Sequence, residues 1–223
     1  MRALRGPAEV HERLGRLPVG WSVVRLGAAC LRIVDGTHQA VETAKEGLPF
    51  LYVSCVRRGR IFWEKASRIH ERTYERISKG REPRRGSVLY TAVGSYGHAA
   101  LVSTDRPFSF QRHIAVLYPK EDRLLGGYLA LWINSQRGKR WSDVHAVGNA
   151  QKTVTLTELS KMLAACPPTS VQRELVEIVR AAEAVVDTRL DRLEALSELK
   201  HSLMHDLLTG RVRVLDVSQV RTS

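Results

Sequence analysis

Polar side chains able to contact bases or phosphates follow glycine turns in this chain. Thr37 and His38 come directly after Asp35-Gly36, a tight-turn pair that would present them at a loop tip. Gln151 and Lys152 are adjacent, so one side chain could read a base edge while the other holds a phosphate. Glycine in such turns permits close approach of the backbone to a ligand, and these side chains are able to hydrogen-bond base edges.

Each of these patterns also has a purely structural interpretation. His38 can be solvated beside a tight turn, and Gln151 can hold its own loop ahead of a helix cap. Tyr96, in a Gly-flanked turn, can stack on a base or touch a phosphate, but it can equally pack half-buried in a hairpin. Of the paired basic residues Arg57-Arg58 and Arg84-Arg85, we expect at least one pair to contact phosphate, although any single arginine is more often only a surface residue.

Known catalytic patterns are missing from the sequence. Gly94-Ser95-Tyr96-Gly97 lacks the Gly-x-Ser-x-Gly spacing of a nucleophile elbow, and there is neither a Walker A sequence nor a dinucleotide fingerprint. Methyltransferase motifs of the Asn-Pro-Pro-Tyr type and a Pro-Asp…Glu-x-Lys nuclease core are also missing. His201 and His205 have the spacing of a helical metal pair but lack a third ligand, so solvated or partner-facing histidines are favoured. We expect no catalytic residue and no metal site, with catalysis supplied by other subunits.

Charge is distributed unevenly along the chain. The 223 residues have a formal net charge of +12 and a sequence pI near 10.1. Between Val171 and His205, five basic residues face seven acidic ones, so the positive excess lies in the first 170 residues. A basic head followed by a near-neutral helix is typical of a phosphate-binding domain with a dimerisation arm. Solvated arginines on the surface of a soluble protein would give the same balance.

The sequence indicates the cellular compartment mainly through features that it lacks. The N-terminus lacks an apolar leader segment, and no run reaches the length of a membrane span. Cys30, Cys55 and Cys166 are odd in number and far apart, which favours buried thiols in a reducing cytoplasm. We therefore predict a cytoplasmic protein with no membrane partner, whose residues 1–16 form a flexible basic leader.

Hydrophobic patterning predicts an α+β fold with a mixed, mostly antiparallel sheet. Apolar runs separated by Gly or Pro predict strands at residues 49–56, 60–63, 87–93, 98–103 and 112–117. Helices are predicted from Leu125 to about Arg140 and from Leu156 to about Leu163, the second with Thr155 and Glu158 as a capping box.

One long helix is predicted at residues 169–209, with Thr169 and Gln172 as a capping box and Gly210 as the C-terminal cap. Apolar residues recur along it at alternating four- and three-residue steps, which is typical of a helix that packs against another helix. The predicted dimerisation residues are Leu175, Val179, Ala182, Val186, Leu190, Leu193, Leu196 and Leu203.

Phrases along the chain resemble the specificity subunits of type I restriction–modification systems, in the order found in that family. The family's "LPxGWxxxxLG" entry, "xxDGTH" loop, "GDILLTxxG.xG" segment, "FxxNR" turn, "GSAQxxLS" segment, "PPLxEQxxI" helix start and "LLTGxxRV" end all have counterparts. They stand at residues 17–27, 33–38, 86–97, 108–112, 148–156, 167–176 and 207–214. Two departures occur: Gln111 stands where Asn is frequent, and Ser170 and Val171 replace the usual acidic residue before Gln172.

The resemblance implies a target-recognition domain at residues 17–168, a spacer helix at 169–209 and a tail at 210–223. It implies recognition of double-stranded DNA rather than bond cleavage, as a non-catalytic subunit. Adenine-methylating modification subunits using S-adenosylmethionine, and ATP- and Mg-dependent restriction subunits in the full assembly, would be its partners. The implied DNA contacts are Thr37, His38, Arg57, Arg58, Arg84, Arg85, Ser95, Tyr96, Arg112, Asn149, Gln151 and Lys152.

Members of the family normally join two recognition domains and two helical regions, whereas this sequence contains one of each. We therefore predict a homodimer paired antiparallel through its long helices, which reads an interrupted palindrome. A helix over residues 170–208 would be about 58 Å long at about 1.5 Å per residue. At about 3.4 Å per base pair, the half-site centres would lie at most roughly 17 base pairs apart.

Two other functions remain open from the sequence. A single-chain nuclease or methyltransferase is disfavoured by the missing motifs. A stand-alone dimeric DNA-binding regulator is the main alternative, and it would bind an operator without any modification partner.

Overall fold

A computed structural model of the chain describes residues 17–213. The predicted leader, and the tail from residue 214 onward, lie outside the described residues. The chain divides into two compact units between Val176 and Glu177. The first eight residues of the long helix therefore belong to the first unit, which we call the head, and the boundary lies later than the predicted one at residue 168.

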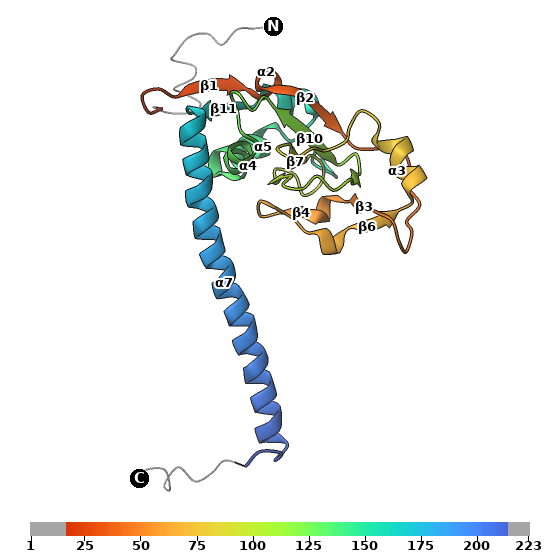
Figure 1. Cartoon of the computed structure of the whole chain (residues 1–223), viewed down its shortest axis with the longest axis vertical. Coiled ribbons are helices and arrows are strands. Elements are labelled where there is room, and N and C mark those ends of the chain that lie inside the picture. The colour runs from red at the N-terminus through yellow and green to blue at the C-terminus, as the bar shows by residue number, and fades with distance from the viewer. Residues whose placement is uncertain (1–16, 214–223) are drawn as a thin grey trace. The chain divides into compact units, whose positions relative to one another are not determined.

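Short strands and helices alternate through the head (Figure 1). In chain order they are β1 (Ser22–Arg25), α2 (Leu26–Ala29), β2 (Cys30–Asp35), β3 (Leu48–Leu51), η1 (Val53–Cys55), β4 (Val56–Arg57), β5 (Arg60–Ile61), η2 (Trp63–Lys65), β6 (Ser67–Ile69), α3 (Glu71–Ser78), β7 (Val88–Thr91), β8 (Ala99–Leu101), β9 (Ser109–Phe110), β10 (Ile114–Pro119), α4 (Gly126–Asn134), α5 (Gln136–His145), α6 (Leu156–Lys161) and β11 (Leu163–Cys166). The last helix, α7 (Thr169–Leu208), starts in the head and continues into the second unit.

The main sheet has the strand order β2-β10-β7-β8, and all its neighbouring strands are antiparallel. Its central strands are apolar at successive positions because both faces of the sheet are buried. Along β7, Val88 and Tyr90 face one hydrophobic cluster, while Leu89 faces the other. The alternation continues along β10, where Ala115 and Leu117 share the cluster of Val88, and Ile114, Val116 and Tyr118 share that of Leu89.

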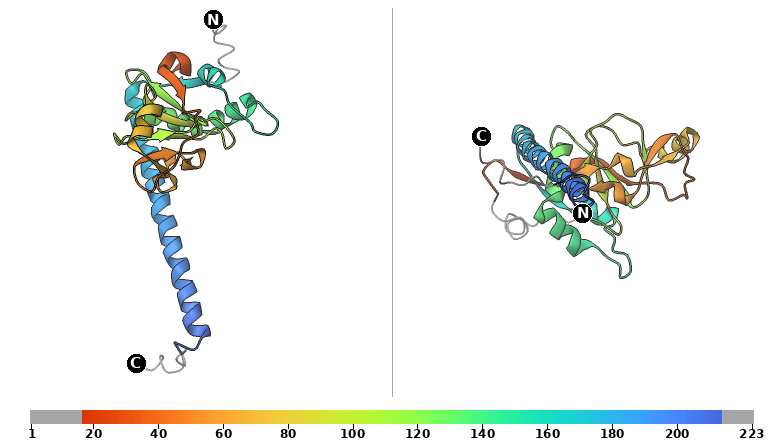
Figure 2. Two further views of the ribbon diagram at one scale, coloured as in Figure 1. Left: turned by 90° about the vertical axis from the view of Figure 1, so that its right-hand side faces the viewer. Right: turned by 90° about the horizontal axis from the view of Figure 1, so that it is seen from below.

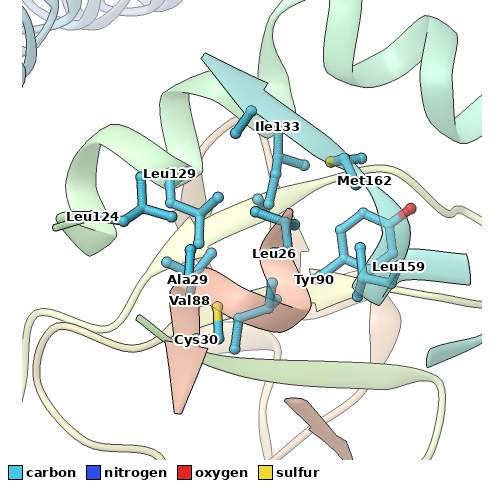
Figure 3. Packing of buried hydrophobic residues seen from close by; sticks show 14 of the residues in the cluster. Leu26, Ala29, Cys30, Val88, Tyr90, Leu124, Leu129, Ile133, Leu159 and Met162 are labelled. Atoms are coloured by element: carbon cyan, nitrogen blue, oxygen red, sulfur yellow. The ribbon is translucent and has the colours of Figure 1, made fainter. Parts of the chain in front are cut away.

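The first cluster is the core between the sheet and helices α2, α4 and α6. Figure 3 shows Leu26 and Ala29 of α2 facing Leu129 and Ile133 of α4, with Leu159 and Met162 closing one side. Two tyrosine hydroxyls lie in this cluster: that of Tyr90 donates to Ser142 Oγ at 3.0 Å, and that of Tyr128 donates to the Ala165 carbonyl at 2.8 Å. Burial raises the pKa of Tyr90 to about 12, so the phenol stays protonated and keeps its hydrogen bond to Ser142.

Smaller sheets complete the head. β3 pairs with β6 antiparallel and with β9 parallel, β1 pairs with β11 antiparallel, and β4 and β5 form a hairpin. The α+β fold with mostly antiparallel pairing agrees with the sequence prediction, as does the long helix. All three cysteines are buried, and burial raises the pKa of Cys30 to about 12.

Some predicted elements differ in extent or identity. The helix predicted from Leu125 to Arg140 is two helices, because Ser135 adopts an extended ψ of 161° and caps α5 through its hydroxyl, which accepts from Gly138 N–H. The helix predicted from Leu156 ends at Lys161, although the Thr155 hydroxyl does accept from Glu158 N–H as predicted. Residues 163–166 instead form β11, whose pairing with β1 joins residues about 140 positions apart. The sequence reading also missed β1, β2 and α3.

The two ends of α7 differ in how well the sequence predicted them. Gly210 has a φ of 69° and donates to the Leu207 carbonyl, so it is the predicted C-terminal cap. The predicted pairing of Thr169 with Gln172 is wrong, because the helix already includes Thr169 and the Gln172 side chain points into the head. Gln172 accepts from Leu125 N–H and donates to the carbonyls of Arg123 and Pro167, each at 2.8 Å.

Candidate nucleic-acid interface

Loops leave the main sheet together at one end. β2 and β7 end there, at Asp35 and Thr91, and β10 and β8 begin there, at Ile114 and Ala99. The antiparallel register places these four residues in neighbouring positions. We call this side of the head, formed by residues 35–38, 92–98, 111–113 and 147–153, the loop end.

Backbone hydrogen bonds join the Asp35–His38 loop to the Phe110–His113 turn. Thr37 N–H donates to the Phe110 carbonyl at 3.1 Å, and Arg112 N–H donates to the Thr37 carbonyl at 3.0 Å. A side chain at Gly36 would bring its Cβ within 2.3 Å of the Phe110 carbonyl oxygen, so only glycine fits there. Two phrases far apart in sequence thus form one surface, which presents His38 and Arg112.

Thr37 does not lie at a loop tip as predicted. Its side chain is buried, and its hydroxyl accepts from Gln39 N–H at 3.2 Å, so Thr37 shapes the loop rather than facing a ligand. His38 is exposed, and its Nε2 lies 2.6 Å from Asp35 Oδ2. Arg112 is also exposed, with its guanidinium Nε 3.4 Å from His113 Nε2.

The Gly94–Gly97 turn packs against the 147–153 loop. Gly94 N–H donates to the Lys152 carbonyl at 3.0 Å, and Val154 N–H donates to the Ala92 carbonyl at 2.8 Å. The exposed side chains of Asn149, Gln151 and Lys152 belong to this loop, which projects from the head after α5 (Figure 2). The structure therefore brings Ser95 and Tyr96 close to Gln151 and Lys152.

Both polar side chains of the Gly94–Gly97 turn have partners from other elements. Arg57, at the end of β4, donates from Nη2 to Ser95 Oγ at 2.7 Å. The Tyr96 hydroxyl donates to Asp143 Oδ1 of α5 at 3.0 Å, and the Tyr96 ring is half-buried. Tyr96 thus has the packing role that the sequence left open, and Ser95 anchors the β4–β5 hairpin to the loop end.

Positive charge surrounds two histidines at the loop end. Burial lowers the pKa of His98, and the charges of Arg57 and Lys139 lower it further. Burial likewise lowers the pKa of His113, and the nearby Arg112 and His38 lower it further. Charges that disfavour an added proton in this way also favour the approach of an anion such as a DNA phosphate.

Helix α5 contributes basic residues that sequence reasoning missed. Besides the Tyr96–Asp143 hydrogen bond, Ser142 lies against Gly97, where an added Cβ would come within 3.2 Å of it. Lys139 and Arg140 are exposed on this helix, and Lys139 lies near enough to His98 of the loop end for its charge to lower the pKa of His98. The basic residues that follow Ser135 in the sequence could have indicated this part of the surface. They were overlooked because one helix was predicted from Leu125 through Arg140.

Arg84 and Arg85 lie at the opposite end of the main sheet. They precede β7, whose other end carries the Gly94–Gly97 turn, and Gly86 N–H donates to the Val102 carbonyl beyond β8. Arg85 pairs with Asp105 at 2.8 Å. The predicted set of DNA contacts therefore does not form one surface, because these two arginines are separated from the rest.

Along α7, an apolar stripe is exposed to solvent. Within this stripe the exposed fraction is 54% for Val186, 63% for Leu193 and 52% for Leu203. Leu175 is an exception among the predicted dimerisation residues, because it and Val176 pack against the core of the head. The remaining members of the stripe are Val179, which is half-buried, and Ala182, Leu190 and Leu196, which are exposed.

Within residues 17–213, His, Cys, Asp and Glu side chains form no group of three or more that could hold a metal ion. His201 Nδ1 lies 2.8 Å from the carbonyl oxygen of Ser197, one turn earlier in α7. No helix in this part of the chain is long and apolar enough to cross a membrane.

Comparisons with known proteins point to one group. No protein-family model matches the chain. The type I restriction enzyme MjaVIII specificity subunit of Methanocaldococcus jannaschii is 20% identical in an alignment of 211 residues that covers 92% of this chain and 49% of that protein. The chain thus spans about half the length of the curated relative it matches.

Solved structures share the fold. The HsdS subunit from Thermoanaerobacter tengcongensis matches with a TM-score of 0.58 and 19% identity, covering 88% of this chain and 48% of that one. A structure of a type I restriction–modification system, described for its complex assembly and conformational transition, matches with a TM-score of 0.59 and 20% identity, covering 85% and 44%. The S subunit from M. genitalium has a TM-score of 0.52 and 15% identity, covering 83% and 44%. In sequence and in fold, the chain is thus similar to about one half of a type I restriction–modification specificity subunit.

Proposed function

We propose that this chain is the non-catalytic specificity subunit of a type I restriction–modification complex. In this proposal the head binds double-stranded DNA at a specific sequence through its loop end, and two copies pair through α7. Each dimer reads a two-part palindromic site and scaffolds the methyltransferase subunits.

The observation that carries the DNA-binding proposal is the convergence of polar loops at one end of a rigid sheet. His38, Arg112, Gln151 and Lys152 come from three separate loops, and backbone hydrogen bonds tie these loops to the sheet. Loops held by a scaffold in this way can place several hydrogen-bonding groups against base edges at once. The positive charge around His98 and His113 supports an anionic ligand.

The exposed stripe of α7 supports pairing with a second copy. Leucine and valine side chains at helical spacing remain about half exposed, and burying them against an identical stripe would remove this apolar area from water. A second copy would also supply the second head that a palindromic site requires.

The partners and cofactors follow from the same proposal. Modification subunits would bind S-adenosylmethionine and methylate adenine, and restriction subunits would use ATP and Mg²⁺. Since DNA is the ligand, we place the complex in the cytoplasm. The chain itself supplies recognition and assembly.

Size-exclusion chromatography with light scattering tests this proposal. We expect the purified chain to have the mass of a dimer at micromolar concentration and to co-elute with its cognate modification subunit. A dimer that binds DNA but ignores that subunit would instead favour the stand-alone regulator. A monomer with an intact head and an ordered helix would contradict pairing through α7.

A further inference from the structure

The β4–β5 hairpin carries three arginines, and Arg57 joins it to the loop end through Ser95. Arg57 and Arg60 form its last paired positions, and Arg58 and Gly59 are the two turn residues between them. On the other side of the sheet from α4, Val56 of β4 and Ile61 of β5 pack into the second hydrophobic cluster. The strands are short, but this buried base and the Arg57–Ser95 hydrogen bond fix the hairpin to the head.

Arg58 has an unusual backbone conformation. Its φ is 49°, and among residues 17–213 it is the one non-glycine residue with a positive φ. With Gly59 at 78°, both central residues of the turn are left-handed, as in a type I′ hairpin turn. Asn, Asp or Gly normally occupies the first of these positions, because larger side chains are sterically disfavoured there.

No hydrogen bond or ion pair of the Arg58 side chain within the described head accounts for this conformation. The side chain is exposed, and in the part of the chain that the structure describes it makes neither a hydrogen bond nor an ion pair. Arg57 differs, because its guanidinium is held by Ser95. A strained residue at a fixed tip with an unused guanidinium points to a ligand outside the chain.

We infer that Arg58 is a specificity-determining residue that reads a G·C base pair from the tip of the β4–β5 hairpin. This inference rests on the proposed DNA-binding function. A two-stranded ribbon fits the major groove of B-DNA, and the planar guanidinium matches the O6 and N7 acceptors of guanine. Arg57, held by Ser95, contacts the phosphate backbone and sets the position of the hairpin.

The substitution Arg58→Asn separates side-chain readout from folding. Asparagine accepts the left-handed conformation more readily than arginine, so the hairpin turn is retained while the guanidinium is removed. We expect the thermal midpoint of Arg58→Asn to equal or exceed that of the unmodified chain. Arg85→Ala is the control variant, because it removes one positive charge, as Arg58→Asn does, but at the opposite end of the main sheet.

The probe is a pool of DNA duplexes with a randomised central segment. The full-length chain is mixed with this pool, and the duplexes that it binds are recovered and sequenced. We expect Arg58→Asn to lose the preference for G·C at one position of each half-site, with about tenfold or more weaker binding to the unmodified chain's selected site. Binding to an unrelated duplex should change by less than about threefold. Arg57→Ala should weaken binding to every duplex, including the unrelated one, because it removes a phosphate contact, and it should reduce the salt dependence of binding by about one charge.

Two outcomes would overturn the inference while leaving the proposed function intact. One is selection by Arg58→Asn of the same sequence with the same base preferences as the unmodified chain. The other is a uniform loss of affinity for all duplexes, which would make Arg58 a phosphate contact. If the unmodified chain selects no sequence at all, the proposed function itself fails. Arg85→Ala should select the unmodified motif.

Discussion

At the scale of single residues, Gln172 has a role that its position on a helix does not suggest. Its side chain is fully buried, and its amide satisfies the free N–H at the start of α4 together with two carbonyls of neighbouring segments. Unpaired polar groups in a core are costly, so this one side chain serves three backbone groups at once. It fixes the first turn of α7 to the head.

Replacing Gln172 with leucine tests this role. We expect Gln172→Leu to lower the free energy of unfolding by about 2–4 kcal/mol, because it leaves buried backbone groups without hydrogen bonds. Urea unfolding followed by circular dichroism measures the change. The neighbouring substitution Arg173→Leu, at an exposed position, should change stability by no more than about 0.5 kcal/mol. Equal effects of the two substitutions would rule out the proposed role of Gln172.

At the scale of elements, α7 combines two kinds of packing in one helix. Its first turns are part of the head, where Leu175 and Val176 pack against the core, and its later turns expose the apolar stripe. Because Leu175 is already used in the head, the proposed pairing surface runs from Val179 to Leu203.

Two alanines on α7 provide a matched test of pairing. Both Ala182 and Ala184 are exposed, but Ala182 lies on the stripe and Ala184 is about 200° away around the helix. We expect Ala182→Glu to weaken dimerisation about tenfold or more, since a two-fold interface would bury the carboxylate twice. Ala184→Glu should leave the dimer unchanged. Sedimentation over a range of protein concentrations gives both dissociation constants, and equal values would exclude the stripe as the interface.

At the scale of the whole molecule, two-fold pairing would make binding depend on both half-sites together. A duplex with both selected half-sites should bind about 100-fold or more tightly than one with a single half-site, because the second contact becomes intramolecular. Inserting about five base pairs between the half-sites turns one of them by about half a helical turn, and should abolish this gain. Fluorescence anisotropy measures all three affinities. Equal affinity for the one-site and two-site duplexes would argue for independent heads.

The sequence alone determined the features that depend on neighbouring residues. The length of α7 and its Gly210 cap follow from uninterrupted helical periodicity and one left-handed position, both of which are local properties. The apolar runs of β7, β8 and β10 predicted strands, because a strand buried on both faces is hydrophobic throughout.

Only the tertiary structure decided which predicted residues share a surface. Thr37 is polar, as His38 is, but its side chain is buried. Arg84 is basic, as Arg58 is, but it lies at the opposite end of the main sheet. Strand pairing made this separation, since the antiparallel register sends alternate loops to opposite ends. The role of Gln172 and the pairing of β1 with β11 were also undetectable locally, because their partners are distant in sequence and are fixed by burial within the assembled core.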